Sequence, residues 1–256
     1  MASGPLRRIE FLGAYLDLVT MTEAVDFAER AIAQGVPRQH ASLSASVVAE
    51  MHRDSALRAA LRSFDLVTAD GQGVVWGGRL LGYRVPGRVT GIDLMQQLLA
   101  QAHVHEYSVF LLGAKPAVLA RTVAVVESRY PGIRIAGTRH GYFPRTHEAA
   151  IVSSIASSGA QLLFVAFSSP ERELFLVRNR DELHVPFAMG VGGSFDVLSG
   201  RRKRAPRFLQ KLGLEWAFRL VQEPRRLGPR YLAGHTRFVG LLARYYAGAR
   251  VRGRRK

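Results

Sequence analysis

The 256-residue sequence contains no cysteine, which excludes disulfide bonds and thiolate chemistry and is compatible with a reducing compartment. It has no run approaching the roughly 20 apolar residues that span a bilayer, and its N-terminus lacks the apolar stretch and cleavage site of a signal peptide. Of the eight histidines, the one close pair, His103 and His105, flanks a predicted helix end and is expected at the surface. We therefore expect no metal site and no other bound cofactor.

Two common nucleotide-binding motifs are also missing. Gly71 and Gly73 follow a predicted strand, but Trp76 stands where the dinucleotide-binding fingerprint requires its third glycine. No P-loop pattern occurs anywhere in the sequence. These absences argue against an NAD-dependent enzyme and against a P-loop NTPase.

Acidic residues are scarce in the last 57 positions, which hold 17 Lys/Arg against only Glu215 and Glu223. The preceding 199 residues hold 19 Lys/Arg and 18 Asp/Glu, so nearly all of the formal charge of +16 lies at the C-terminus. We divide the chain into a near-neutral catalytic core, residues 1–199, and a basic amphipathic appendage, residues 200–256. A basic segment of this kind suits an anionic partner, either nucleic acid or an anionic membrane face.

Short apolar runs alternate with helical patterns along the core, which predicts a Rossmann-like α/β fold with a mostly parallel sheet. The spacing predicts a strand or hairpin over 12–19 and further strands over 64–68, 107–112, 133–136, 161–166 and 185–191. It predicts helices over 22–34, 46–62, 116–129 and 171–179. Because ligands of such sheets bind at the carboxyl ends of the strands, four residues should meet at one crevice: Asp70, Gly113, Ser168 and Gly192.

Several polar residues near these strand ends have both a structural and a functional interpretation. Asp70 begins an ordinary Asp-Gly turn, or it is a carboxylate placed to accept a proton from a hydroxyl. Thr90 and Asp93 fit a helix cap, whereas Arg88, between Gly87 and Val89, fits a phosphate- or carboxylate-binding role. Lys115 precedes a predicted helix, where it is either solvated or near a phosphate.

The appendage has apolar and aromatic residues at helical spacing among its basic residues, beginning at Phe208 and ending near Leu220. This pattern fits either a docked amphipathic helix or an interfacial helix on anionic lipid. Residues 238–246 repeat the pattern, and we expect a second such helix there. No RRM, KH or helix-turn-helix pattern supports nucleic-acid binding.

Five sequence blocks together resemble the WecB/TagA/CpsF glycosyltransferase family (glycosyltransferase family 26), in the family's order, over about residues 9–232. The blocks are TADGQGVV at Thr68–Val75, RVTGIDLM at Arg88–Met95, VFLLGAKP at Val109–Pro116, YPGIRIAGTRHGYF at Tyr130–Phe143, and GVGGSFDVLSGRRKRAPRFLQKLGLEWAFRLVQEPRRL at Gly190–Leu227. The resemblance implies a Rossmann-like core with a C-terminal appendage that binds the membrane and completes the active site. It also implies metal-independent, inverting transfer of a sugar from a UDP-sugar to an undecaprenyl-diphosphate-linked acceptor at the cytoplasmic membrane face.

By position, the resemblance makes Asp70 the catalytic base and Arg88 a contact to the sugar or phosphate. It assigns the acceptor end of the site to three appendage arginines, Arg219, Arg226 and Arg230. It places the substrate-binding positions at Ser42, Ser44, Gly113, Arg172, Gly192 and Gly193.

Two departures from the family pattern bear on substrate choice. Ser42-Leu43-Ser44 stands where the family has Thr-Pro-Asn, and Pro170-Glu171-Arg172-Glu173 where it has Pro-Lys-Gln-Glu. The donor therefore stays open among UDP-N-acetylmannosamine, its uronic acid and UDP-glucose, with Arg172 suited to an acidic sugar. A nucleic-acid-binding protein and a catalytically weak scaffold in a polysaccharide assembly complex remain as alternatives. The sequence also leaves open whether the chain works as a homo-oligomer.

Overall fold

The computed structural model describes residues 6–253, without the side chains at positions 211, 226, 227, 229, 230 and 249–253. Its centre is a six-stranded sheet in which all neighbouring strands are parallel. A separate antiparallel hairpin, β1 (Arg8–Phe11) and β2 (Ala14–Asp17), precedes it. The sheet order is β4 (Leu66–Ala69), β3 (Arg38–Leu43), β8 (Phe187–Gly190), β7 (Leu162–Ala166), β5 (Val109–Gly113) and β6 (Ile135–Arg139). This architecture confirms the predicted Rossmann-like α/β class.

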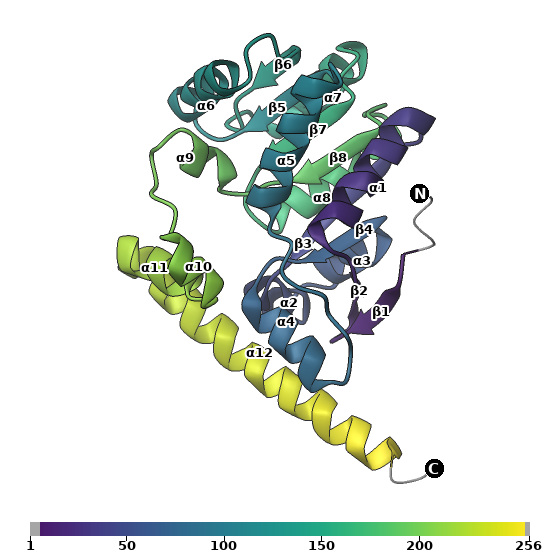
Figure 1. The fold of residues 1–256 in the computed structure, drawn as a ribbon, viewed down its shortest axis with the longest axis vertical. Coiled ribbons are helices and arrows are strands. Elements are labelled where there is room, and N and C mark those ends of the chain that lie inside the picture. Colours follow the sequence, from purple (N-terminus) through teal and green to yellow (C-terminus); the bar gives the residue numbers. More distant parts are fainter. Residues whose placement is uncertain (1–5, 254–256) are drawn as a thin grey trace.

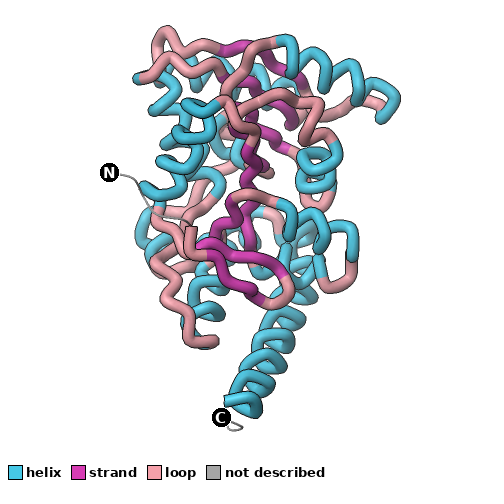
Figure 2. The backbone as a smooth tube through the Cα atoms, turned by 90° about the vertical axis from the view of Figure 1, so that its right-hand side faces the viewer, coloured by secondary structure: helices cyan, strands magenta, loops and turns pink. Residues whose placement is uncertain are grey.

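Helices cover both faces of the sheet, so the strands run through the middle of the molecule (Figure 2). Successive strand residues such as Leu111 and Leu112 pack into opposite apolar clusters, as the two-residue period of a strand requires. One cluster includes α1 (Met21–Gln34), α5 (Gly91–Val104), α6 (Pro116–Arg129) and α9 (Ser194–Leu198). The other includes α2 (Ala45–Met51), α3 (Ser55–Ser63), α4 (Gln72–Leu80), α7 (Glu148–Ser157), which follows a short 3₁₀ turn (Arg145–His147), and α8 (Glu171–Arg178).

Helix boundaries follow local signals where those signals are strong. Thr20 and Glu23 form a capping box at the start of α1, and Gly35 ends that helix with a left-handed φ of 63°. Pro116 occupies the first turn of α6, where its missing N–H has no intrahelical partner. Both helices match the sequence prediction within one residue.

The prediction of one helix over 46–62 is wrong, because the segment forms two helices, α2 and α3. Asp54 begins the second helix, since its carboxylate accepts hydrogen bonds from the backbone N–H groups of Ala56 and Leu57. An internal N-cap therefore interrupts a helical pattern that looked continuous.

The sheet also contains a strand that the pattern did not predict and one that is displaced. β3 lies between β4 and β8 and carries His40 and Ser42 among its apolar residues, which obscured the strand signal. β6 begins at Ile135 rather than at 133, and Gly137 lies inside the strand instead of ending it. A Cβ atom at Gly137 would collide with the ring of Phe110, so this glycine permits close packing against β5.

The appendage forms three helices where the pattern predicted two. The segment expected as one helix over 208–220 divides into α10 (Arg207–Lys211) and α11 (Glu215–Gln222). Gly213 separates them with a φ of +73°, and a Cβ atom there would lie 2.6 Å from the side chain of Gln72. The break is therefore set by a close contact with α4 of the core.

The last helix, α12 (Pro224–Gly253), packs along α2 and extends beyond the core at its C-terminal end (Figure 1). Phe238 is buried in the apolar cluster of the core, with its ring centroid 6.5 Å from that of Phe11. The helix expected over 238–246 is thus the middle of a longer one that docks through one face. Among residues 6–253, no helix has the length and apolar content needed to cross a bilayer.

Candidate active site

A cavity of about 730 Å³ lies between the carboxyl ends of the sheet strands and the appendage. Segments that follow five parallel strands contribute residues from the core: Ser44 after β3, Asp70 after β4, Lys115 after β5, Ser168 after β7 and Gly192 after β8. The appendage contributes the opposite side through Arg201, Arg202, Lys203, Arg204, Glu215, Arg219, Gln222, Glu223 and Tyr231. The predicted crevice at the strand ends is therefore present, as parallel topology requires.

Asp70 lies at the end of β4, where its backbone N–H donates to the carbonyl oxygen of Leu43 at 3.0 Å. Burial raises the pKa of the Asp70 carboxyl above its ordinary value. Arg219 opposes this rise in the pKa of Asp70, whereas Glu215 adds to it. Arg172 and Arg88 also oppose it, so the net result is a carboxylate that holds a proton more tightly than a solvated one does. A carboxylate with these properties can act as a general base.

Arg88 makes an ion pair with Glu215, with 3.3 Å between its Nη1 and the Glu215 Oε2. Glu215 is one of the described residues that line the cavity and Arg88 is not, so the arginine lies behind the carboxylate. Thr90 and Asp93 have the predicted capping role at the start of α5, with Thr90 Oγ1 accepting from the Asp93 N–H at 3.2 Å. Asp93 in addition binds Arg204 of the appendage at 2.7 and 2.8 Å.

Ser42 and Ser44 both line the cavity but differ in their contacts. Ser44 is the N-cap of α2 and accepts from the Val47 N–H at 3.4 Å. The hydroxyl of Ser42 is buried and has no hydrogen-bond partner among the described residues. That unpaired hydroxyl is available to a bound ligand.

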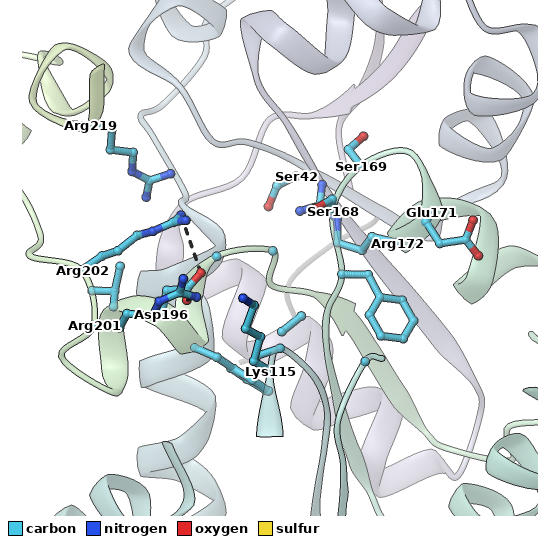
Figure 3. Close-up of a pocket in the computed structure, with 18 of the residues that line it drawn as sticks. Ser42, Lys115, Ser168, Ser169, Glu171, Arg172, Asp196, Arg201, Arg202 and Arg219 are labelled. Carbon is cyan, nitrogen blue, oxygen red and sulfur yellow. Dashed lines mark hydrogen bonds and ion pairs between the residues drawn. The ribbon is translucent and has the colours of Figure 1, made fainter. Parts of the chain in front are cut away.

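Arg172 lies across the ends of β7 and β8, close to Ser42 and Ser168 (Figure 3). The buried Glu173 carboxylate accepts from its Nε at 3.0 Å, and the Arg172 side chain is only 12% exposed. A Cβ atom at Gly190 would collide with the Arg172 side chain, and one at Gly192 would lie 2.7 Å from its Nη1. These two glycines therefore provide the space in which the arginine lies, which gives Gly192 a role beyond lining the cavity.

The two remaining glycines have different positions. Gly193 lines the cavity, whereas among the described lining residues Ala114 and Lys115 replace the predicted Gly113. Gly113 has a φ of +122°, and a Cβ atom there would lie 2.8 Å from the backbone of Ala166. Its contribution is close packing of β5 on β7 next to the site.

Lys115 projects into the cavity at the N-terminus of α6 (Figure 3). It is the N-cap residue and makes no side-chain capping hydrogen bond, which leaves the first-turn N–H groups of α6 available. Asp196 of α9 binds Arg201 at 2.9 Å and lies 3.6 Å from Arg202. Sequence patterns predicted no site role for five residues, although the GRRKR run at 200–204 indicated a local concentration of positive charge. These residues are Asp196, Arg201, Arg202, Arg204 and Glu215.

Of the three appendage arginines expected at the acceptor end, Arg219 lines the cavity and pairs with Glu215 at 3.4 Å. Arg226 and Arg230 fall on α12, but their side chains lie outside the described residues. Within the described part of the chain, no group of three or more His, Asp or Glu side chains is arranged to hold a metal ion.

Two of the matches with known proteins bear on this site. The profile described as the glycosyl transferase WecG/TagA/CpsF family matches residues 9–252 of this chain. A Bacillus spizizenii protein named N-acetylglucosaminyldiphosphoundecaprenol N-acetyl-beta-D-mannosaminyltransferase is 40% identical over 168 residues, which cover 66% of this chain and 65% of the relative. The aligned region thus spans slightly less than two thirds of the relative. The profile match confirms the family resemblance carried by the five sequence blocks.

Proposed function

This chain belongs to the WecG/TagA/CpsF glycosyltransferase family, and we propose that it is an inverting glycosyltransferase of cell-surface polysaccharide biosynthesis. The proposed reaction moves a sugar from a UDP-sugar to an undecaprenyl-diphosphate-linked acceptor. The relative's name includes such an acceptor, with N-acetylglucosamine on the lipid diphosphate. The observation that carries the proposal is the position of Asp70, a partly buried carboxylate at a strand end facing a wall of cations.

In the proposed reaction, Asp70 takes the proton from the acceptor hydroxyl as that oxygen attacks the anomeric carbon of the donor. The bond from the anomeric carbon to the β-phosphate oxygen breaks on the opposite side, and UDP leaves with the electron pair. Negative charge therefore grows on the diphosphate. Arg219, which lines the cavity, is placed to stabilise it directly, and Arg88 acts from behind Glu215 through its charge. Lys115 and the free N–H groups of α6 provide a second subsite in the cavity that can bind an anion.

The donor sugar is the least determined part of the proposal. The relative's name supports N-acetylmannosamine, whereas Arg172 in the cavity suits a sugar that carries a carboxylate. Purified protein with an N-acetylglucosaminyl-diphospholipid acceptor, assayed against UDP-N-acetylmannosamine, its uronic acid and UDP-glucose, distinguishes them. Transfer from at least one donor is expected. No transfer and no UDP release with any of them would contradict the proposed activity.

We also propose that the appendage docks on an anionic membrane, where the lipid-linked acceptor lies. Its helices expose apolar side chains beside the basic ones, among them Phe208, Leu212, Trp216, Val221, Leu232 and Val239. Replacing Phe208, Leu212 and Val221 by serine should weaken co-sedimentation with anionic vesicles. The matched control replaces Val36 and Val104, exposed apolar residues of the core, by serine.

Unchanged co-sedimentation of the appendage variant would contradict the membrane proposal. The same variants on immobilised RNA, each in a salt series, test the alternative partner. Retention on RNA that exceeds retention on vesicles at equal salt would favour nucleic acid.

A further inference from the structure

Glu215 is the first residue of α11 and stands where the appendage meets the core. Its carboxylate lies among three guanidinium groups: Arg88 at 3.3 Å, Arg219 at 3.4 Å and Arg204 at 3.8 Å. The Glu215 side chain is only 11% exposed. This is one of the two acids of the appendage, and it is nearly buried in an otherwise basic segment.

The three arginines come from three separate segments. Arg88 precedes α5 in the core, Arg204 lies in the loop before α10, and Arg219 is on α11 itself. Arg204 is also held by Asp93, whereas Arg88 and Arg219 each pair with Glu215. Guanidinium groups so close together repel one another unless an anion lies between them. Glu215 is the anion that lets Arg88 and Arg219 converge.

The same carboxylate lies close to the proposed base. Burial raises the pKa of Asp70, and Glu215 is the acid that raises it further. The charged groups that face Asp70 are Arg88 from the loop before α5, Arg172 from α8, Arg204 from the loop before α10, and Arg219 with Glu215 from α11. Glu215 is thus the one negative group in a set that is otherwise cationic.

We propose that Glu215 is a positioning residue for sugar transfer: it holds Arg88 and Arg219 beside Asp70 and so couples closure of the appendage to assembly of the site. This role rests on the proposed transferase function. Glu215 touches the arginines rather than the reacting atoms, and its effect on the reaction passes through them. Without it, the arginines that stabilise the departing diphosphate are no longer fixed at the base.

The test compares Glu215→Gln, Glu215→Asp and the control Glu223→Gln. Glu215→Gln should lower kcat on the order of 10- to 100-fold and raise the donor KM by less, because the lost interaction matters most as charge develops. It should also move the acid limb of the kcat profile to higher pH, because Arg219 lowers the pKa of Asp70 by more than Glu215 raises it and is no longer held beside the base.

The two other variants separate position from charge. Glu215→Asp keeps the charge and should keep the acid limb near its original pH while recovering part of kcat. Glu223→Gln removes an equal charge from the same appendage, where Glu223 pairs with Arg202 at 2.7 Å, and should leave the acid limb in place. A fall in kcat with an acid limb in Glu215→Gln that is unmoved or moved to lower pH, or wild-type kcat and profile, would overturn the proposal.

A direct titration separates this proposal from the proposed function. The Asp70 carboxyl is followed by NMR in the intact wild type and in Glu215→Gln, after circular dichroism has verified that the variant is folded. A higher Asp70 pKa in the variant supports the positioning role even if the right donor has not been found, and a lower or unchanged pKa contradicts it. If Glu215→Gln does not fold, the pKa of Asp70 is measured in Glu215→Asp instead. A wild-type kcat in Glu215→Asp would contradict the need for an exact position of the carboxylate. Absence of transfer by the wild type with every donor would instead contradict the proposed function.

Discussion

The two walls of the cavity are stabilised by different forces. The core wall stands on strands that are apolar and buried on both faces, such as β5 and β7. Beyond residue 200, the buried residues among those described are Ala205, Gly213, Glu215, Gly234 and Phe238. Leu241 and Leu242 pack half-buried against the core, and ion pairs of Arg204 and Glu215 add further contacts. Apolar burial is insensitive to salt, whereas partly exposed ion pairs are weak and screened. The appendage wall is therefore the part that we expect to open at low free-energy cost.

The sharpest test of this comparison replaces one phenylalanine in each region. Phe164→Ala in β7 removes a fully buried ring and should lower the free energy of unfolding of the whole chain by about 4 kcal/mol. Phe238→Ala in α12 should cost about 3 kcal/mol, but locally, by releasing the helix from Phe11. Hydrogen exchange should rise in α12 while β7 stays protected. Equal loss of protection in both regions would show that appendage and core unfold as one unit.

The second test concerns the base in the core wall. Asp70→Asn should reduce turnover by a factor on the order of 10² or more, about 2.7 kcal/mol in the barrier, because the amide cannot accept the hydroxyl proton. The variant should also be more stable at neutral pH. The folded-state pKa of Asp70 is raised, so ionisation above that pKa disfavours the folded state. Near-normal turnover would remove Asp70 from the role of base.

The third test concerns His40, a buried histidine of β3 in the core. His40 donates to or accepts from Thr68 Oγ1 at 2.9 Å, and burial lowers its pKa to about 3. The contribution of neutral His40 to the free energy of unfolding is fully present above pH 6.5, the ordinary pKa of histidine. It is lost as the pH falls toward 3, the pKa of His40 in the folded protein. Between pH 7 and pH 5 this loss amounts to about 2 kcal/mol.

His40→Gln should flatten the fall in the free energy of unfolding over this pH range. The matched control is His147→Gln, which replaces an exposed histidine by the same residue. If the free energy of unfolding of His40→Gln falls as steeply with pH as that of the wild type, other groups cause the destabilisation in acid.

The smallest expected effect is the difference in coupling energy between an exposed ion pair of the core and an ion pair that joins the appendage to the core. The Arg134–Glu106 pair of the core is exposed on both sides, so a double-mutant cycle should give a coupling energy of at most about 0.5 kcal/mol. The Arg204–Asp93 pair, which joins appendage to core through two contacts, should give about 1 kcal/mol and lose part of it at high salt. Equal coupling energies would remove the distinction between the two kinds of pair.

Sequence patterns predicted the parts of the fold that are encoded locally. Apolar runs at β5 and β7 that alternate with the helical spacing of α1 and α6 were sufficient to predict the parallel α/β sheet. The pattern did not reveal β3, because a strand that carries His40 and Ser42 has no continuous apolar run. It also extended one helix through the N-cap at Asp54, since a cap in the middle of a helical pattern reads as an ordinary surface residue.

The strand order decided which polar residues meet. The sequence alone placed Asp70, Ser168 and Gly192 at strand ends, and the rule for parallel sheets placed them at one edge. The convergence of Arg88, Arg204 and Arg219 on Glu215 required the fold, because these residues are separated by up to 131 positions and no local period links them. Charge composition marked the appendage as basic, but only tertiary packing selected the acid that is buried among its cations. A periodic pattern reports the neighbours of a residue along its own helix or strand, whereas an ion-pair cluster depends on the distances between elements.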